Sequence, residues 1–330
     1  MRLIAGTKRG VRVLRWIEGE RVAALRTRAL EAEEIRAAAQ RGSTVFVGTG
    51  NGKAFASGDG GAAWEPVLEG LECDAVCCLA TGRGGTSPLF AGTEPSALFA
   101  LEDGDGVWRE IESFRALDAT EEWRGYGERR AHVQTVEVDP HAEKRLYVGV
   151  EIGGAYASDD GGRTWHVIGD GLYEDVHRLA VDPRRGTRMY AATGGGLYVS
   201  DDRGLSWREH PEEVGSQYCT ALWVGSDRAG TSVLYLATAG GTPAEWPRRG
   251  AQARVHVSRD AGSSWSEAEI GARRTSKEAY TVIAPDPVDP ESIFVATDGG
   301  TIYHGRRNGE RWSAIYRGTE AILTLLVIRS

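Results

Sequence analysis

The sequence predicts an all-β fold, a single seven-bladed β-propeller over residues 1–330. Three observations support this fold. One eight-residue motif recurs along the chain, each copy lies between the same strand-like runs, and an apolar run at the C-terminus supplies a strand that the N-terminal segment lacks. With 41% hydrophobic residues the chain can form a core. Its length is within the range of closed all-β folds that form one domain.

The motif has the pattern S-x-D-x-G-x-[ST]-W. Complete copies lie at 158–165, 200–207 and 258–265. The copy at 57–64 departs from the pattern only where Ala63 replaces Ser or Thr, and two degenerate copies lie at 101–108 and 305–312. A period of roughly 40 to 58 residues is typical of repeated β units such as propeller blades.

Each motif is flanked in the same way. Before 158–165 come the runs VQTVEVDP (133–140), RLYVGV (145–150) and GGAYAS (153–158), and WHVIGD (165–170) follows. One unit therefore contains four strands, A to D, and the motif forms the C–D turn. We expect the Asp to accept backbone N–H bonds there, glycines to adopt positive φ and the Trp to bury its ring. The residues expected to stabilise these turns are Asp59, Trp64, Asp160, Trp165, Asp202, Trp207, Asp260 and Trp265.

The units divide the chain into blades. Six blades are predicted at 34–71, 72–114, 132–174, 175–216, 217–270 and 278–320. The N-terminal runs RLIAGTK, GVRVLRW and RVAALR are predicted as strands B, C and D of the first blade. We expect AILTLLVIR (321–329) to be its innermost strand, which closes the ring and removes exposed sheet edges.

On these motifs, the chain resembles the Asp-box or BNR-repeat β-propellers, over essentially its whole length. Residues 91–108 and 145–165 are similar to bacterial members described as BNR-repeat, glycosyl-hydrolase-like or sialidase-like. Sialidases, xyloglucanases, sortilin-type receptors and photosystem assembly factors share the motif, so the resemblance implies the fold and leaves the function open. No sialidase RIP-type motif is present, xyloglucanases use a cleft between two propellers, and no export signal of the photosystem factors is found.

Two long loops indicate where a ligand site lies. In a propeller the D–A and B–C loops emerge on one face, here called the first face, and the motif turns lie on the second face. The predicted loops 114–132 and 238–255 both belong to the first face. We expect Glu122, Trp123 and Arg124 of one loop and Trp246 and Arg248 of the other to bind a polar ligand with an apolar side, Trp123 and Trp246 meeting across the channel. The alternative is that each loop packs its own Trp on the barrel.

Polar residues at strand ends add to this site. The candidate catalytic residues are Glu94, His132, Glu151, His177 and Glu320, and further candidate ligand-binding residues are Asp74, Tyr218 and Tyr280. Paired carboxylates can act as general acid and base, and the two histidines with a carboxylate could hold a divalent metal. No other cofactor is indicated. For any single residue the alternative is a polar side chain that closes a strand.

Two functions from different classes remain open. One is a glycoside hydrolase- or lyase-like enzyme that acts on a sugar or small polar substrate, and the other is a non-catalytic platform for a protein partner. The net charge of −8 disfavours nucleic acid. No apolar run is long enough for a membrane helix, no signal peptide is recognised, and four cysteines without framework spacing are expected to be reduced, which predicts a cytoplasmic protein.

Overall fold

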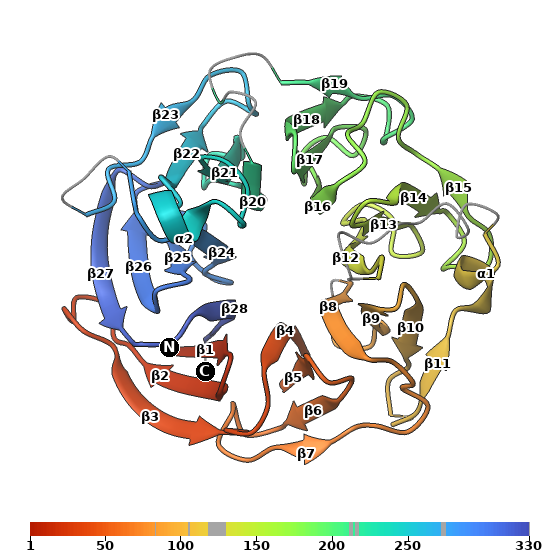
Figure 1. Ribbon diagram of the computed structural model, residues 1–330, viewed down its shortest axis with the longest axis horizontal. Helices are drawn as coiled ribbons and strands as arrows, with labels where there is room; N and C mark the ends of the chain where they lie inside the picture. Colours follow the sequence, from red (N-terminus) through yellow and green to blue (C-terminus); the bar gives the residue numbers. More distant parts are fainter. Residues whose placement is uncertain are drawn as a thin grey trace.

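The computed structural model describes residues 1–82, 84–104, 106–117, 130–210, 214, 218–271 and 275–329. Seven four-stranded antiparallel sheets surround a central axis, as Figure 1 shows. The predicted all-β, seven-bladed propeller is therefore confirmed. Within the described residues the helices are the short α1 (Glu112–Arg115) and α2 (Trp246–Arg249), and no helix there is long and apolar enough to cross a membrane.

The strands of each blade run in chain order from the axis outward, except in blade 1. Blade 1 contains β28 (Ile322–Ile328), β1 (Arg2–Thr7), β2 (Gly10–Arg15) and β3 (Ala24–Ala29). Blade 2 contains β4 (Ile35–Arg41), β5 (Thr44–Thr49), β6 (Ala54–Ser57) and β7 (Glu65–Pro66). Blade 3 contains β8 (Ala75–Thr81), β9 (Leu89–Glu94), β10 (Leu98–Leu101) and β11 (Trp108–Glu110). Blade 4 contains β12 (Val133–Val138), β13 (Leu146–Val150), β14 (Gly154–Ser158) and β15 (His166–Val167).

The remaining blades repeat this order. Blade 5 contains β16 (Val176–Val181), β17 (Met189–Thr193), β18 (Gly196–Ser200) and β19 (Arg208–Glu209). Blade 6 contains β20 (Tyr218–Ser226), β21 (Ser232–Ala239), β22 (Arg254–Ser258) and β23 (Ser266–Glu267). Blade 7 contains β24 (Tyr280–Pro285), β25 (Ile293–Thr297), β26 (Thr301–Arg306) and β27 (Arg311–Arg317).

The C-terminal strand closes the ring as predicted. β28 pairs antiparallel with β1, from Arg2 opposite Ile328 to Thr7 opposite Ile322, and the two chain ends lie in one blade (Figure 1). The third strand of blade 1 begins three residues later than the predicted run RVAALR. A loop precedes it, in which the Trp16 indole donates to Glu20 O (3.1 Å) and Ala23 N–H donates to Ile315 O of blade 7 (2.6 Å).

Adjacent blades approach closely through glycines in their second strands. A Cβ atom on Gly92 would lie 2.4 Å from Val133 Cγ1 of the next blade, and one on Gly48 would lie 2.4 Å from Val76 Cγ1. Gly6 and Gly149 make the same approach, to Ile35 at 2.6 Å and to Val176 at 2.7 Å. No heavier side chain fits at these distances. Each glycine thus makes room for the β-branched residue at the start of the neighbouring innermost strand.

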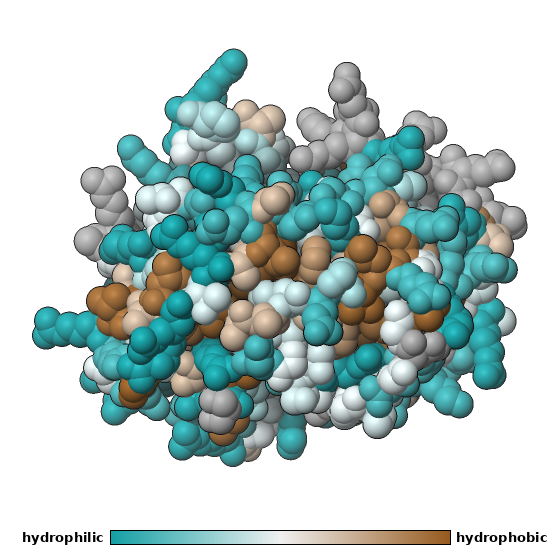
Figure 2. Space-filling view, turned by 90° about the horizontal axis from the view of Figure 1, so that it is seen from below, coloured by the Kyte–Doolittle hydropathy of each residue, from teal (hydrophilic) through white to brown (hydrophobic). Residues whose placement is uncertain are grey.

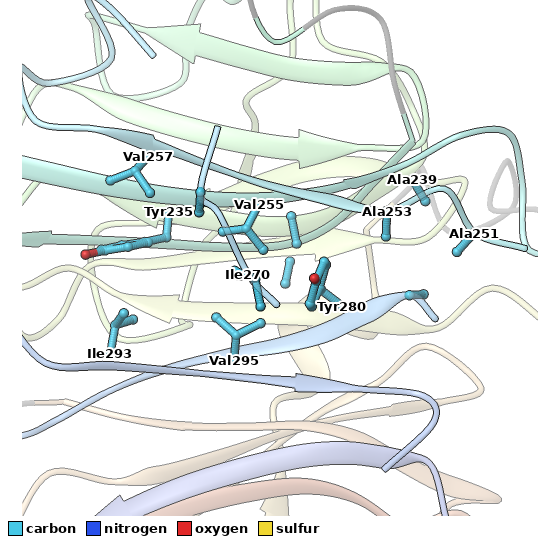
Figure 3. Close-up of a cluster of buried hydrophobic side chains, with 14 of the residues drawn as sticks. Tyr235, Ala239, Ala251, Ala253, Val255, Val257, Ile270, Tyr280, Ile293 and Val295 are labelled. Atoms are coloured by element: carbon cyan, nitrogen blue, oxygen red, sulfur yellow. The ribbon is translucent and has the colours of Figure 1, made fainter. Parts of the chain in front are cut away.

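Apolar layers between blades form the core. Figure 3 shows the layer between blades 6 and 7, where Tyr235 and Val255 lie opposite Ile293 and Val295. At the rim, hydrophobic residues gather in a belt with hydrophilic residues on both sides of it (Figure 2). The outermost strand is only two or three residues long in five blades, namely β7, β11, β15, β19 and β23.

The motif turns have one hydrogen-bond pattern. In the turn at 158–165, Asp160 Oδ1 accepts from Ser158 Oγ (2.9 Å) and from the Thr164 backbone N–H (2.9 Å), while Oδ2 accepts from the Thr164 hydroxyl (2.7 Å). The Thr164 N–H and hydroxyl hold the pKa of Asp160 well below its usual range. Asp59, Asp202 and Asp260 accept from the equivalent serines at 2.7–2.8 Å.

The tryptophans of these turns differ in burial. Trp207 is 6% exposed, while Trp64, Trp165 and Trp265 are half-buried. The Trp165 indole donates to Ser113 Oγ (3.2 Å) and packs edge-on against Phe114 (5.0 Å between centroids). The turn of blade 4 is therefore attached to the end of blade 3.

We predict that Gly92→Ala destabilises the protein by about 1–3 kcal/mol, because the added methyl overlaps Val133. The free energy of unfolding in urea measures this effect. Val133→Ala alone also destabilises, but in the Gly92→Ala background it should restore part of the loss. Additive effects of the two substitutions would contradict the close approach.

We predict that Ala63→Ser raises the melting temperature, because Ala63 stands where Thr164, Ser206 and Ser264 donate a hydroxyl to their motif Asp. The new hydroxyl would reach Asp59 Oδ2. Differential scanning calorimetry measures the effect of Ala63→Ser on the melting temperature, once in the wild-type protein and once in the Asp59→Ala variant. A gain that persists without the Asp59 carboxylate would disprove this explanation.

Candidate functional site

A β-bulge interrupts every innermost strand near its start, at the second or third residue. The strand pairing skips Arg36 in β4, Cys77 in β8 and Gln134 in β12. In the other blades it skips His177, Thr220, Thr281 and Leu323. A bulge redirects a side chain out of the regular alternation. These seven residues, here called the bulge ring, encircle the axis near the first face.

The bulge ring has two halves. Arg36, Cys77, Gln134 and Leu323 line a cavity. The other three residues bond to the backbone of the next blade. Thr220 Oγ1 donates to Tyr280 O (2.7 Å), Thr281 Oγ1 donates to Ile322 O (2.6 Å), and His177 Nδ1 lies 2.6 Å from Cys219 O. One side of the channel is thus held together by these bonds, while the other side presents polar groups.

The channel-mouth cavity has a volume of about 380 Å³. It is lined by Lys8, Glu34, Arg36, Cys77, His132, Gln134, Glu151 and Leu323. Lys8 and Glu151 come from B–C turns, and Glu34 and His132 immediately precede innermost strands, so the cavity lies at the first face. This volume is within the range of small-molecule sites.

Arg36 organises the blade 2 and blade 3 side of this cavity. Its Nε donates to Glu34 Oε1 (2.7 Å), and its Nη1 lies 3.8 Å from Glu94 Oε2. One guanidinium therefore lies between two carboxylates, each partly exposed. The arrangement places both signs of charge on one wall of the cavity, which suits a ligand with several hydrogen-bonding groups.

The buried His132 pairs with the partly exposed Glu151 on the blade 4 side. His132 Nε2 lies 2.9 Å from Glu151 Oε2 and 3.0 Å from Gln134 Oε1, and His132 is 7% exposed. Burial alone lowers the pKa of His132, but the hydrogen bond and charge of Glu151 outweigh it, so the pKa is raised. The pair can therefore supply a proton at the cavity wall.

A second pair lies in blade 5. His177 Nε2 is 3.2 Å from Asp175 Oδ1, and His177 is 8% exposed. Burial lowers the pKa of His177, and the neighbouring Asp175 carboxylate more than compensates, so this pKa is also raised. The ring of His177 lies 4.7 Å from that of Tyr218, which lies 5.9 Å from Trp246 of α2. The predicted loop 238–255 of blade 6, which contains Trp246, therefore lies on the first face next to the His177 and Tyr218 rings.

Other predicted residues lie elsewhere. Asp74 forms an exposed pair with Arg130 (3.5 Å), Tyr280 is 4% exposed within the core, and Arg248 is exposed on α2. Glu320 pairs with Arg12 in a different cavity. Glu122, Trp123 and Arg124, and with them the expected meeting of Trp123 with Trp246, lie outside the described residues.

Sequence reasoning missed several lining residues, namely Lys8, Glu34, Arg36, Cys77 and Gln134. The available signal was the charged or polar residue after the first residue of an apolar strand, as in EIRAAA (34–39) and HVQTVEV (132–138). It also missed Asp298, whose pKa is raised by burial and by the charge of Glu278. Glu278 Oε2 accepts from Thr297 Oγ1 (2.6 Å) in the same corner of blade 7.

The sequence left open a divalent metal held by His132, His177 and a carboxylate. In the part of the chain that the structure describes, no group of three or more His, Cys, Asp or Glu side chains is arranged to hold a metal ion. His132 and His177 are instead each held by one carboxylate, Glu151 and Asp175.

Comparisons with known proteins find two kinds of similar protein, xyloglucanases or other GH74 enzymes and YCF48. No family model matches the chain. It is 24% identical over 277 residues to a probable oligoxyloglucan-reducing end-specific xyloglucanase of Neosartorya fischeri, covering 72% of this chain and 32% of that protein. It is 29% identical over 140 residues to the oligoxyloglucan-reducing end-specific xyloglucanase of Emericella nidulans, covering 40% and 16%. The chain thus spans at most about a third of the curated relatives it matches.

Solved structures agree on the propeller. The GH74 enzyme of Niastella koreensis superposes with a TM-score of 0.66 at 18% identity, over 85% of this chain and 45% of that chain. The GH74 xyloglucanase from Xanthomonas campestris gives 0.64 at 16%, over 86% and 45%. YCF48 bound to D1 peptide gives 0.54 at 17%, over 85% and 81%. At these identities the likeness shows the fold alone.

We predict that Glu151→Gln lowers the pKa of His132 below that of a free histidine, because burial then acts without the opposing charge. In the wild type the pair's contribution to stability is full below the unfolded pKa of about 6.5 and is lost as the pH rises through the raised folded pKa. NMR titration of the His132 ring and urea unfolding between pH 5 and 9 measure both effects. Glu143→Gln, at an exposed site on the same blade, is the control, and an unshifted His132 in Glu151→Gln would contradict the prediction.

Proposed function

We propose that the channel-mouth cavity binds a sugar or another small polar molecule, and that the chain is a glycoside hydrolase-like member of the Asp-box propellers. The observation that carries this proposal is the set of groups in one cavity. The His132–Glu151 pair, the Arg36 guanidinium with Glu34, and Lys8 face the same space of about 380 Å³. Sugars present many hydroxyls that both donate and accept, and this wall offers donors and acceptors side by side.

The comparisons favour a carbohydrate over other polar ligands. Both curated relatives are named as xyloglucanases that act on oligoxyloglucan reducing ends, and GH74 enzymes are among the structural neighbours. The four motif turns and their shared Asp hydrogen bonds support placement among the Asp-box propellers. Because the chain covers only part of these relatives, the substrate is proposed as a class, a neutral oligosaccharide.

Acid–base chemistry is within reach of the same groups. Glu151 and Gln134 both lie at His132 Nε2 (2.9 and 3.0 Å), so a substrate oxygen that takes the place of the Gln134 oxygen would receive the Nε2 proton when a glycosidic bond breaks. Glu34 can accept the proton of the water that attacks the anomeric carbon. Glu94 holds Arg36 from the other side and would position it. In this scheme His132 is the acid, Glu34 the base, and Glu151 sets the protonation of His132.

A second candidate function is a binding platform for a protein partner. The match to YCF48 bound to D1 peptide covers 81% of that chain, against 45% of the GH74 enzyme of Niastella koreensis, so the larger part of the YCF48 chain is matched. The partly exposed rings of Tyr218 and Trp246, which pack in series on the buried His177, lie on the first face where a peptide could contact them. This candidate places the contact on blades 5 and 6, away from Arg36.

Thermal unfolding with a panel of oligosaccharides, monosaccharides and divalent metals, with and without EDTA, tests the proposal. A ligand at about 100 times its Kd stabilises by about 2.7 kcal/mol, which shifts the melting temperature by a few degrees. We expect a neutral oligosaccharide to give such a shift, and Arg36→Ala to abolish it. Lys144→Ala, an exposed change on the second face, is the control and should keep it.

Turnover separates the two functions. Release of reducing ends that is lost in His132→Gln while the thermal shift remains would support the enzyme. A shift in melting temperature without release of reducing ends would indicate a protein that binds the sugar and does not cleave it. A shift that survives both Arg36→Ala and His132→Gln would place the ligand elsewhere and contradict the proposed site.

A further inference from the structure

A second polar cavity lies at the seam where the ring closes. It has a volume of about 350 Å³ and lies between blade 1 and the last strand of blade 7. Its polar lining includes Thr7, Arg9, Arg12, Arg28, Arg317 and Glu320. It shares no lining residue with the channel-mouth cavity. We refer to it as the seam cavity.

We propose that the seam cavity binds a small molecule that carries a phosphate or carboxylate group. Four arginines and one glutamate give its lining a net charge of +3, while the whole chain carries −8. Within this acidic protein the excess of positive charge is local. The proposal is independent of the sugar site, because it depends on different residues in a different cavity.

The strand pairing concentrates this charge. Arg12 of β2 and Arg28 of β3 are direct cross-strand partners, so their side chains leave the same face of blade 1. Like charges directly opposite each other destabilise a sheet unless something neutralises them. In the described part of the chain, neither Arg28 nor Arg317 forms an ion pair with a carboxylate. An anion bound between Arg12 and Arg28 would remove the repulsion between these two side chains.

Glu320 neutralises only part of the charge. Its Oε2 accepts from Arg12 Nη2 (2.6 Å) and from Thr7 Oγ1 (3.3 Å), and its Oε1 lies 3.8 Å from Arg9 Nε. The Arg12 side chain is 9% exposed and is fixed further by Nη1 donating to Arg9 O (2.9 Å). Glu320 thus shows that this wall accepts a carboxylate oxygen, and Arg28 and Arg317 extend it toward solvent.

The size of the cavity limits the ligand. A volume of about 350 Å³ suits a small molecule, and guanidinium groups bind the paired oxygens of phosphates and carboxylates in a bidentate manner. A ligand there would bridge β2 and β3 of blade 1 to β27 of blade 7. Binding would therefore stabilise the closed ring against unfolding.

Isothermal titration and thermal unfolding of the full chain test the proposal. The probes are inorganic phosphate, glucose 6-phosphate and succinate, each compared with sodium chloride at equal ionic strength. Glucose alone controls for the sugar, and succinate against phosphate distinguishes the two anion sources. We expect at least one anionic probe to raise the melting temperature above the chloride control.

Variants locate the binding. Arg28→Ala should raise the Kd of that probe by about tenfold, the usual loss for one charged hydrogen-bonding partner. Arg26→Ala, at an exposed arginine of the same strand that does not line the cavity, should leave it unchanged. Glu320→Gln should lower the Kd, because it removes the competing carboxylate. Arg28 is exposed, so its variant should fold even if Glu320→Gln does not.

Three results would overturn the proposal. They are a thermal shift no larger than that of chloride with every probe, equal effects of Arg28→Ala and Arg26→Ala, and weaker binding by a folded Glu320→Gln. Arg36→Ala should leave anion binding intact. A negative result for sugar binding at the channel-mouth cavity is therefore distinguishable from a negative result for anion binding at the seam cavity.

Discussion

The close packing of each blade on the next is the constraint on which the first face depends. In four successive blades a glycine makes room for a residue at the start of the next innermost strand, namely Ile35, Val76, Val133 or Val176. The residue that follows each of these is the bulge residue, Arg36, Cys77, Gln134 or His177. Because the buried neighbour is fixed by packing, the backbone of the bulge residue is fixed as well. Core packing thus positions the polar wall of the channel.

The polar groups at the channel-mouth cavity and the seam cavity are held by partners within the protein. Arg36 lies between Glu34 and Glu94, His132 is held by Glu151, and Arg12 by Glu320. Groups oriented in this way need little rearrangement when a ligand arrives, which lowers the entropic cost of binding. The two cavities differ in the net charge of their linings. Balanced charges at the channel mouth suit a neutral polar ligand, and the excess of arginine at the seam suits an anion.

Much of this fold could be predicted from the sequence because turns and strands repeat. The blade limits, the closing strand and the first-face position of Glu151 and His132 follow from motif spacing and strand order. The strand alternation did not predict the bulges, since an extra residue breaks the two-residue period that identifies inward-facing positions, and only the polar residue that follows the first apolar residue signals them. By that alternation Arg36 cannot be distinguished from an ordinary strand residue. The seam could not be predicted either, because Glu320 reaches Arg12 across 308 residues of sequence.

Hydrogen–deuterium exchange with and without a bound oligosaccharide tests the central claim most directly. If packing places the ligand site at the channel mouth, protection should appear at Lys8 and at the starts of β4 and β12, where Arg36, His132 and Gln134 lie. Exchange in the motif turns 57–64 and 158–165 should stay the same. Protection confined to those turns, or to the rim, would contradict the account and move the function to the second face.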